Sequence, residues 1–343
     1  MKKLIIITLL ISTLGLSASE EPVKKDDFKI FKNMPLDVIK HIIPKLSIRD
    51  LVSFGQTSTK HRQIIQAELK KRLPGLSDEK LVKFSKLSNE YLNLAKDEIN
   101  KRVNQQVATF KKGLIGVDLN LSGRDINNIF PGVFRNVDFE KLKTLGLSDN
   151  NLTNVFAGTF SGLKELTKLD LFNNKLKNLE KGAFSGLNNL IQLDLGKNKL
   201  TNIVPGLFKN LSALSSLDLS QNELKDLEKG TFVGLDELTV LVITDNKLTS
   251  LNPGTFKVFK NLTDLYLYNN NLKEVALGSF KGLEKLKRID LSYNQLKNID
   301  PKVFENLGSL EYINLTKNQL SQKNKDSLRK ALPDVEINTD YPY

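Results

Sequence analysis

LDLFNNKL, the stretch Leu169–Leu176, returns with small changes at regular intervals along the chain. Close copies are LDLGKNKL at Leu193–Leu200, LDLSQNEL at Leu217–Leu224 and IDLSYNQL at Ile289–Leu296. Neighbouring copies start 24 residues apart, and this spacing holds without a slip over residues 142–320. A fixed period of this length predicts a solenoid, in which each repeat stacks on its neighbours and cannot fold alone.

Three kinds of residue stay fixed within the repeat. The Leu-x-Leu alternation predicts a short strand whose leucines point inward. The asparagine that follows is expected to satisfy backbone groups of its own turn and of the next coil. The phenylalanine on the return arm is expected to build an aromatic spine. The asparagines are Asn150, Asn174, Asn198, Asn222, Asn246, Asn270, Asn294 and Asn318. The phenylalanines are Phe160, Phe184, Phe208, Phe232, Phe256, Phe280 and Phe304.

The template LxxLxLxxNxLxxLxxxxFxxLxx is similar to the leucine-rich repeat family in its 24-residue form. The resemblance implies the α/β fold class, with a right-handed solenoid over residues 114–320 and a curved parallel sheet on its concave side. An earlier copy around Leu119 and Phe134 is offset by 26 residues and is predicted to be a modified first turn. The family resemblance also implies that a partner binds on the concave side.

The variable residues beside the strand leucines are predicted to line that concave side. They include a stripe of aspartates and, toward the C-terminal half, a group of tyrosines, a combination that suits a protein interface. We expect the target protein to contact Asp170, Phe172, Asp194, Asp218, Tyr266, Tyr268, Asp290, Tyr293 and Tyr312. The carboxylates would repel phosphates, which favours a target with basic patches over nucleic acid. The alternative is that the aspartates are only solvated and that the tyrosines only suit strand propensity.

Both ends of the array need a cap, because an end coil would otherwise expose its apolar side. Residues 76–113 are predicted to form a helical linker or N-terminal cap, since the run from Ser77 to Phe110 contains neither proline nor glycine. After Leu320 the period stops, and residues 321–343 are predicted to form the C-terminal cap.

Residues 30–75 are predicted to form a small all-α domain of three short helices. The pattern is similar to the F-box, which docks substrate receptors onto the Skp-type adaptor of cullin ubiquitin ligases. The resemblance implies that the adaptor contacts are Met34, Pro35, Ile39, Ile42, Leu46 and Leu51. The alternative is a generic helical cap whose apolar stripe is simply core.

The N-terminal residues 1–19 are predicted to be a Sec-type signal peptide. Lys2 and Lys3 precede an apolar run from Leu4 to Leu16, and small residues follow at Ser17–Ser19. The run is too short to span a bilayer as a helix. We therefore expect export, to the exterior or the cell surface or onward into a host cell, and no integral membrane segment after cleavage.

The composition offers little for catalysis. The chain has no cysteine and two histidines, with no HExxH, P-loop or GxGxxG motif. The formal net charge is +12, and most of the surplus lies in the first third of the chain, where a solvated lysine face is the simplest reading. The sequence thus predicts a protein that is not an enzyme and needs no cofactor or metal ion.

Three functional hypotheses follow. The first is an exported bacterial effector, in which the repeats capture a target and the F-box-like module joins it to a host ubiquitin ligase. Without cysteine the chain has neither a thioester nucleophile nor a zinc RING, so it would act as an adaptor. The second is an exported or surface-located recognition or adhesion protein with no ubiquitin role. The third, an enzyme, would have to use Asp170, Asp194 or Asp218.

Overall fold

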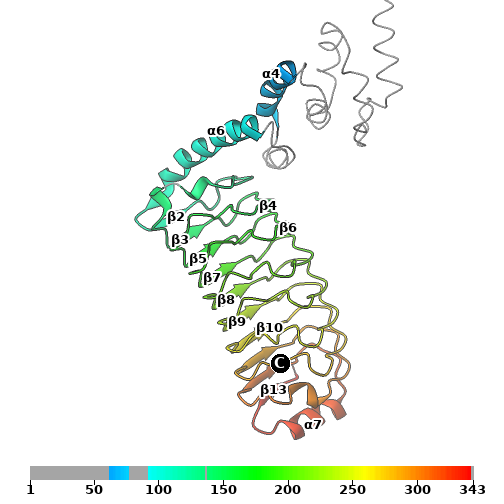
Figure 1. Ribbon diagram of the computed structural model, residues 1–343. Helices are drawn as coiled ribbons and strands as arrows, with labels where there is room; N and C mark the ends of the chain where they lie inside the picture. Colours follow the sequence, from blue (N-terminus) through cyan, green and yellow to red (C-terminus); the bar gives the residue numbers. More distant parts are fainter. Residues whose placement is uncertain (1–61, 77–91, 136, 341–343) are drawn as a thin grey trace, which may run out of the picture. The chain divides into compact units, whose positions relative to one another are not determined.

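The computed structural model describes residues 62–76, 92–135 and 137–340 (Figure 1). The chain divides into two compact units, residues 1–102 and 103–343, and each is described by itself. The predicted signal peptide lies outside the described residues. So do the predicted adaptor contacts Met34, Pro35, Ile39, Ile42, Leu46 and Leu51.

Within the first unit, the structure describes helix α4 (Arg62–Arg72), the 3-10 turn η4 (Leu73–Gly75) and the start of helix α6 (Leu92–Phe110). Leu69 and Leu73 are buried. The Arg102 guanidinium of α6 donates a hydrogen bond of 3.0 Å to the carbonyl oxygen of Pro74. This contact joins the helix to the turn after α4.

The second unit is a solenoid built on one sheet of eleven strands. In Figure 1 the strands follow one another along one side of the coils from β2 to β13. The strands, in sheet order, are β1 (Leu114–Ile115), β2 (Asp118–Asn120), β3 (Thr144–Gly146), β5 (Lys168–Asp170), β7 (Gln192–Asp194), β8 (Ser216–Asp218), β9 (Val240–Val242), β10 (Asp264–Tyr266), β11 (Arg288–Asp290), β12 (Tyr312–Asn314) and β13 (Glu336–Asn338). All pairings are parallel except the β1–β2 hairpin at the N-terminal edge.

The sheet register follows the sequence period. Leu145, Leu169 and Leu193 are cross-strand neighbours, and all three are buried, whereas the residues on either side of them in the strand are not. The predicted strand and its inward leucines are therefore confirmed. A second sheet of two short strands, β4 (Asn154–Val155) and β6 (Asn178–Leu179), lies across the coils from the first (Figure 1).

The repeated asparagines form a buried ladder. The Asn174 amide donates to the carbonyl oxygens of Leu171 in its own turn (3.1 Å) and Leu147 in the preceding coil (2.9 Å). Its Oδ1 accepts from the Leu152 amide at 3.0 Å. The expected bonds within the turn are confirmed. The sequence also predicts that the side chain contacts the next coil, and this prediction is wrong. The side chain reaches back to the preceding coil, because the open backbone groups of that coil lie beside it.

The phenylalanines form the expected spine. Each ring is almost completely buried, and Phe160 stacks between Phe134 and Phe184 with centroid separations of 6.1 and 6.2 Å. Similar stacks continue from Phe256 through Phe280 to Phe304. Such aromatic pairs are each worth about 0.5–1.5 kcal/mol beyond their buried area. Short 3-10 turns lie along the return arms, at η6 (Val133–Arg135), η7 (Val137–Phe139) and η8 (Pro301–Phe304).

Each end of the array is closed by a helix segment. At the N-terminal end, the Phe110 ring stacks on Phe134 at 5.9 Å, and the Gln106 side chain bonds to the backbone of Asn128 and Phe130. At the C-terminal end, helix α7 (Gln322–Ala331) is capped by the Ser321 hydroxyl. Strand β13 then completes the sheet beside β12.

Candidate functional site

The outward face of the eleven-stranded sheet, here called the sheet face, is the candidate site. In each coil it presents the residue before the buried strand leucine and the residues one and three places after it. The structure brings eight of the nine predicted contact residues onto this face by that alternation, and Tyr293 lies in the turn that follows Ser292. These eight are Asp170, Phe172, Asp194, Asp218, Tyr266, Tyr268, Asp290 and Tyr312.

The aspartates of the sheet face also have a structural role that the sequence reasoning missed. In each, Oδ1 accepts a hydrogen bond from the backbone amide two residues later, at 2.9 Å for Asp170, 2.8 Å for Asp194 and 2.7 Å for Asp218. Asp290 makes the same bond. Asn314 does so too, at the equivalent place in the next coil. This local turn is a common use of aspartate and asparagine and could have been read from the Asp-Leu-x pattern.

The central aspartates form a crowded acidic stripe. Asp194 is the cross-strand neighbour of both Asp170 and Asp218. The pKa of Asp194 is raised to about 6, chiefly by partial burial and to a smaller extent by the charges of Asp218 and Asp170, while the hydrogen bond from the Gly196 amide opposes the shift. Like charges opposite one another destabilise a sheet. A cationic group bound here would relieve that repulsion.

Phe172 packs beside this stripe, next to Gly196, which has no side chain. A Cβ on Gly196 would lie 3.1 Å from the Phe172 ring and 3.1 Å from the Asp194 carboxylate. The Lys197 ammonium lies 5.8 Å from the centre of the Phe172 ring, within cation–π range. Gly196 therefore gives the Phe172 ring room over the sheet.

Tyrosines dominate the other half of the sheet face. Tyr268 on this face is 37% exposed, and Tyr293 in the turn after β11 is 46% exposed, which is a large exposed fraction for aromatic side chains. The Tyr266 hydroxyl lies 3.5 Å from Asp264 Oδ1, and burial first and then the Asp264 charge raise the pKa of this tyrosine. Tyr312, half-buried, lies beside Arg288 in the neighbouring strand. Rigid rings of this kind suit a protein interface.

Tyr293 has a second unusual property. Its φ is +51°, in the left-handed region that bulky residues avoid. The same turn position has positive φ in every coil of the array, at Asp125, Asp149, Asn173, Lys197, Gln221, Asp245, Asn269 and Lys317. The turn geometry is therefore a property of the repeat, and Tyr293 is the one bulky aromatic residue among the described residues that occupies it. This feature can be seen in the sequence when the repeats are aligned. The residue directly before the ladder asparagine is a tyrosine in this coil and mostly a small polar residue in the other coils.

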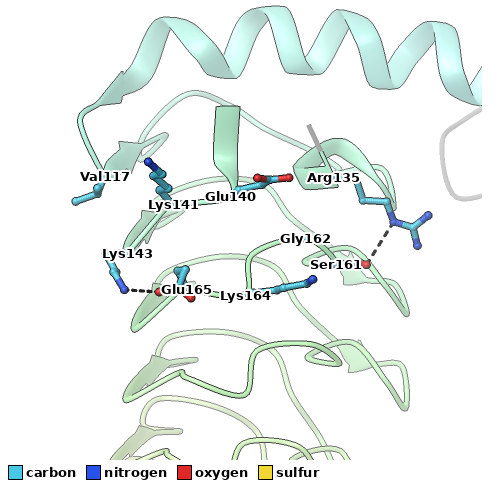
Figure 2. Close-up of a pocket in the computed structure, with 9 residues that line it drawn as sticks. All are labelled: Val117, Arg135, Glu140, Lys141, Lys143, Ser161, Gly162, Lys164 and Glu165. Carbon is cyan, nitrogen blue, oxygen red and sulfur yellow. Dashed lines mark hydrogen bonds and ion pairs between the residues drawn. The ribbon is translucent and has the colours of Figure 1, made fainter. Parts of the chain in front are cut away.

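A separate cleft of about 830 Å³ opens near the start of the array (Figure 2). Charged side chains from successive coils line it, as Figure 2 shows. Lys143 and Glu165 form an ion pair of 2.8 Å, which lowers the pKa of Glu165, and Arg135 Nε donates to the Ser161 hydroxyl at 3.3 Å. The sequence reasoning did not find this cleft, because its residues come from different coils and share no motif.

None of the described helices is both long and apolar enough to cross a bilayer. Among the described residues, no group of three or more histidine, aspartate or glutamate side chains is arranged to hold a metal ion.

The fold defines a class of protein, the repeat solenoids, in which each coil contacts only its neighbours. The leucine-rich repeat family model matches residues 117–176, 164–224, 212–272 and 260–320, more than half of the chain. The chain therefore belongs to the leucine-rich repeat family. The F-box domain model matches residues 31–73, of which the structure describes 62–73.

Comparison with solved structures gives the same fold. TLR13 in the TLR13–ssRNA13 complex is 29% identical with a TM-score of 0.60, over 65% of this chain and 32% of that one. A leucine-rich repeat protein of Leptospira interrogans is 30% identical with a TM-score of 0.56, over 64% of this chain and 54% of that one. The chain thus spans about a third and about half of these two proteins. No curated protein matches in sequence.

Proposed function

We propose that the protein is a non-enzymatic adaptor that holds a target protein on its sheet face. The F-box domain would tether that target to the Skp-type adaptor of a cullin ubiquitin ligase. Leucine-rich repeats and F-boxes are both interaction modules, and together they form the layout of a ubiquitin-ligase substrate receptor.

The observation that carries the proposal is the composition of the sheet face. Three aspartates in register stand on β5, β7 and β8, with Asp194 held at a raised pKa of about 6. Exposed Tyr268 follows β10 on the same face, and exposed Tyr293 lies in the turn after β11. A carboxylate with a perturbed pKa on the same surface as exposed aromatic rings is typical of a binding site. The target would present a basic patch toward the aspartates and an apolar surface toward the tyrosines.

The chemistry of the sheet face favours a protein over a nucleic acid. The TLR13 structure that resembles this chain holds a single-stranded RNA. In this chain the central sheet positions are aspartates, which would repel phosphate groups. Ordered cationic side chains on the target would instead pair with them and lower the pKa of Asp194.

The proposed adaptor role needs no catalytic group. The chain has no cysteine, so it could form neither a ubiquitin thioester nor a thiolate zinc site. Transfer of ubiquitin would be carried out by the ligase that the F-box recruits.

The predicted signal peptide raises the question of where this happens. Ubiquitin ligases act in the eukaryotic cytosol, whereas a Sec-type leader directs export. An exported bacterial effector that enters a host cell reconciles the two. The leader equally favours the alternative function, an exported or surface-located recognition or adhesion protein with no ubiquitin role.

Binding to a purified eukaryotic Skp-type adaptor separates these two functions. The chain without residues 1–19 should bind the adaptor with a Kd in the micromolar range or tighter. Changing Ile42→Asp and Leu46→Asp together should abolish that binding, because charged residues would replace the apolar contacts. Tyr268→Ala serves as the matched control and should bind the adaptor normally.

The ubiquitin role would be abandoned if the chain showed no adaptor binding at tens of micromolar. Equal binding by the wild type and the double variant would also count against it, because the contact would then lie elsewhere. Circular dichroism of both proteins would establish that the double variant still contains the folded repeats.

A further inference from the structure

A groove on the flank of the array has a composition unlike that of the sheet face. It encloses about 1020 Å³ between consecutive coils in the C-terminal half. Phe280, Val303 and Leu307 form its buried apolar base, and Leu277 stands beside them with 57% of its surface exposed. All of these residues belong to the second unit, so the groove is complete within the array.

Leu277 departs from the repeat template. It lies three residues before the spine phenylalanine, and this place is otherwise taken by small, charged or cyclic residues. The equivalent residues in the other coils are Ala157, Lys181, Pro205, Lys229, Pro253 and Pro301. A leucine that is more than half exposed contributes little to the core, so the stability of the repeat does not explain it.

The groove is also basic. Lys257, Lys260, Lys281 and Lys302 line it, against the two carboxylates of Glu284 and Glu305. Within the described part of the chain, none of these six side chains makes a hydrogen bond or an ion pair. Four unpaired ammonium groups around an apolar base attract an acidic ligand. The cleft in Figure 2 differs, because its Lys143 is already neutralised by Glu165.

We infer that this groove binds an acidic peptide segment of a partner protein that carries a large apolar side chain. The apolar side chain would pack against Leu277, Val303 and Leu307, and the flanking carboxylates would pair with the lysines. The opposite charge of the groove and of the central sheet face means that the two surfaces select different partners. The inference stands on the groove alone and is independent of the function proposed for the sheet face.

The test uses fluorescence anisotropy with the full-length chain and a short labelled peptide in which glutamates flank a leucine and a phenylalanine. The wild type should bind this peptide, and added salt should weaken the binding. Leu277→Glu should weaken it at least tenfold, and so should Lys257→Glu combined with Lys281→Glu. Val233→Glu is the matched control, since Val233 is 47% exposed but does not line the groove, and it should leave the affinity unchanged.

Hydrogen exchange of the wild-type chain locates the peptide without any substitution. Peptide binding should protect amides around residues 277–284 and 302–308. No binding at about 1 mM would overturn the inference, and so would equal affinity for the Leu277→Glu and Val233→Glu variants. Protection confined to the sheet strands would overturn it too. The chain could also associate with itself through this groove. If Leu277→Glu removed such self-association and the peptide did not compete with it, the groove would bind a second copy of the chain, and the inference would be overturned.

Discussion

Asp194 and Asp218 are cross-strand neighbours on β7 and β8, and each uses one carboxylate oxygen to hold the turn that follows its own strand. The two carboxylates therefore combine a local stabilising bond with mutual repulsion. An asparagine would make the same turn without the charge, as Asn314 does. The negative charge of aspartate at these places is therefore not needed to form the turn.

Asp194→Asn is expected to stabilise the protein at pH 7. The pKa of Asp194 in the folded chain, about 6, lies above its ordinary value of 3.8. The folded state therefore holds the proton more tightly, and the wild type loses stability as the pH rises from about 4 to about 6. For a fully buried group, the difference between these two pKa values would correspond to ~3 kcal/mol in the free energy of unfolding. Solvent exposure of Asp194 reduces this to about 1–2 kcal/mol.

Urea unfolding of both proteins across this pH range measures the effect. The variant should be more stable than the wild type at pH 7, and the two should converge near pH 4. A variant that is less stable at pH 7 would show that the charge of Asp194 stabilises the folded chain, contrary to this account.

Asn222→Ala should lower the free energy of unfolding by about 1–3 kcal/mol. The Asn222 amide donates to the carbonyl oxygens of Leu195 and Leu219, and its Oδ1 accepts from the Leu200 amide at 3.0 Å. Alanine would leave these buried groups without partners. Urea unfolding measures the loss, and Lys225→Ala, an exposed change in the same coil, is the control. Equal stability of the two variants would refute the asparagine ladder.

The ladder and the spine could be predicted because they recur. A buried asparagine or phenylalanine at every 24th residue admits few structures, and the strand position follows from the alternation of leucines. The dual role of Asp194 could not be predicted in the same way. Its pKa depends on the burial and the neighbouring charges that only stacked coils create. The turn at Tyr293 likewise depends on backbone angles, and the basic groove joins residues of consecutive coils.

Gly162→Ala and Gly186→Ala should differ strongly, although both glycines follow a Phe-Ser pair in the same template place. Both have positive φ, which alone costs an alanine about 1–2 kcal/mol. A Cβ on Gly162 would also lie 2.3 Å from the Phe134 carbonyl oxygen, whereas one on Gly186 would meet nothing within 4 Å. Thermal unfolding should therefore show a clearly larger loss for Gly162→Ala. Equal losses would mean that the coils do not approach this closely.

Thr159→Val is expected to stabilise the protein by about 1 kcal/mol. The Thr159 hydroxyl is buried and has no hydrogen-bond partner among the described residues. Valine keeps the shape of the side chain, and Val303 already occupies the equivalent place in another coil. Ser279→Ala is the contrasting change, because the Ser279 hydroxyl donates to the Leu251 carbonyl oxygen at 2.9 Å, and its loss should destabilise. Chemical denaturation measures both changes in stability. A destabilised Thr159→Val variant and a stabilised Ser279→Ala variant would contradict the hydrogen bonding described for these two hydroxyls.

The most direct test of the sheet face is quantitative affinity purification from eukaryotic cells, with the wild type compared with a chain that combines Tyr266→Ala and Tyr268→Ala. Val233→Ala, an exposed apolar change that is not on this face, is the matched control. We expect the captured target to be lost from the tyrosine variant and kept by the control, with similar unfolding curves for all three proteins. Undiminished capture by the folded tyrosine variant would contradict it.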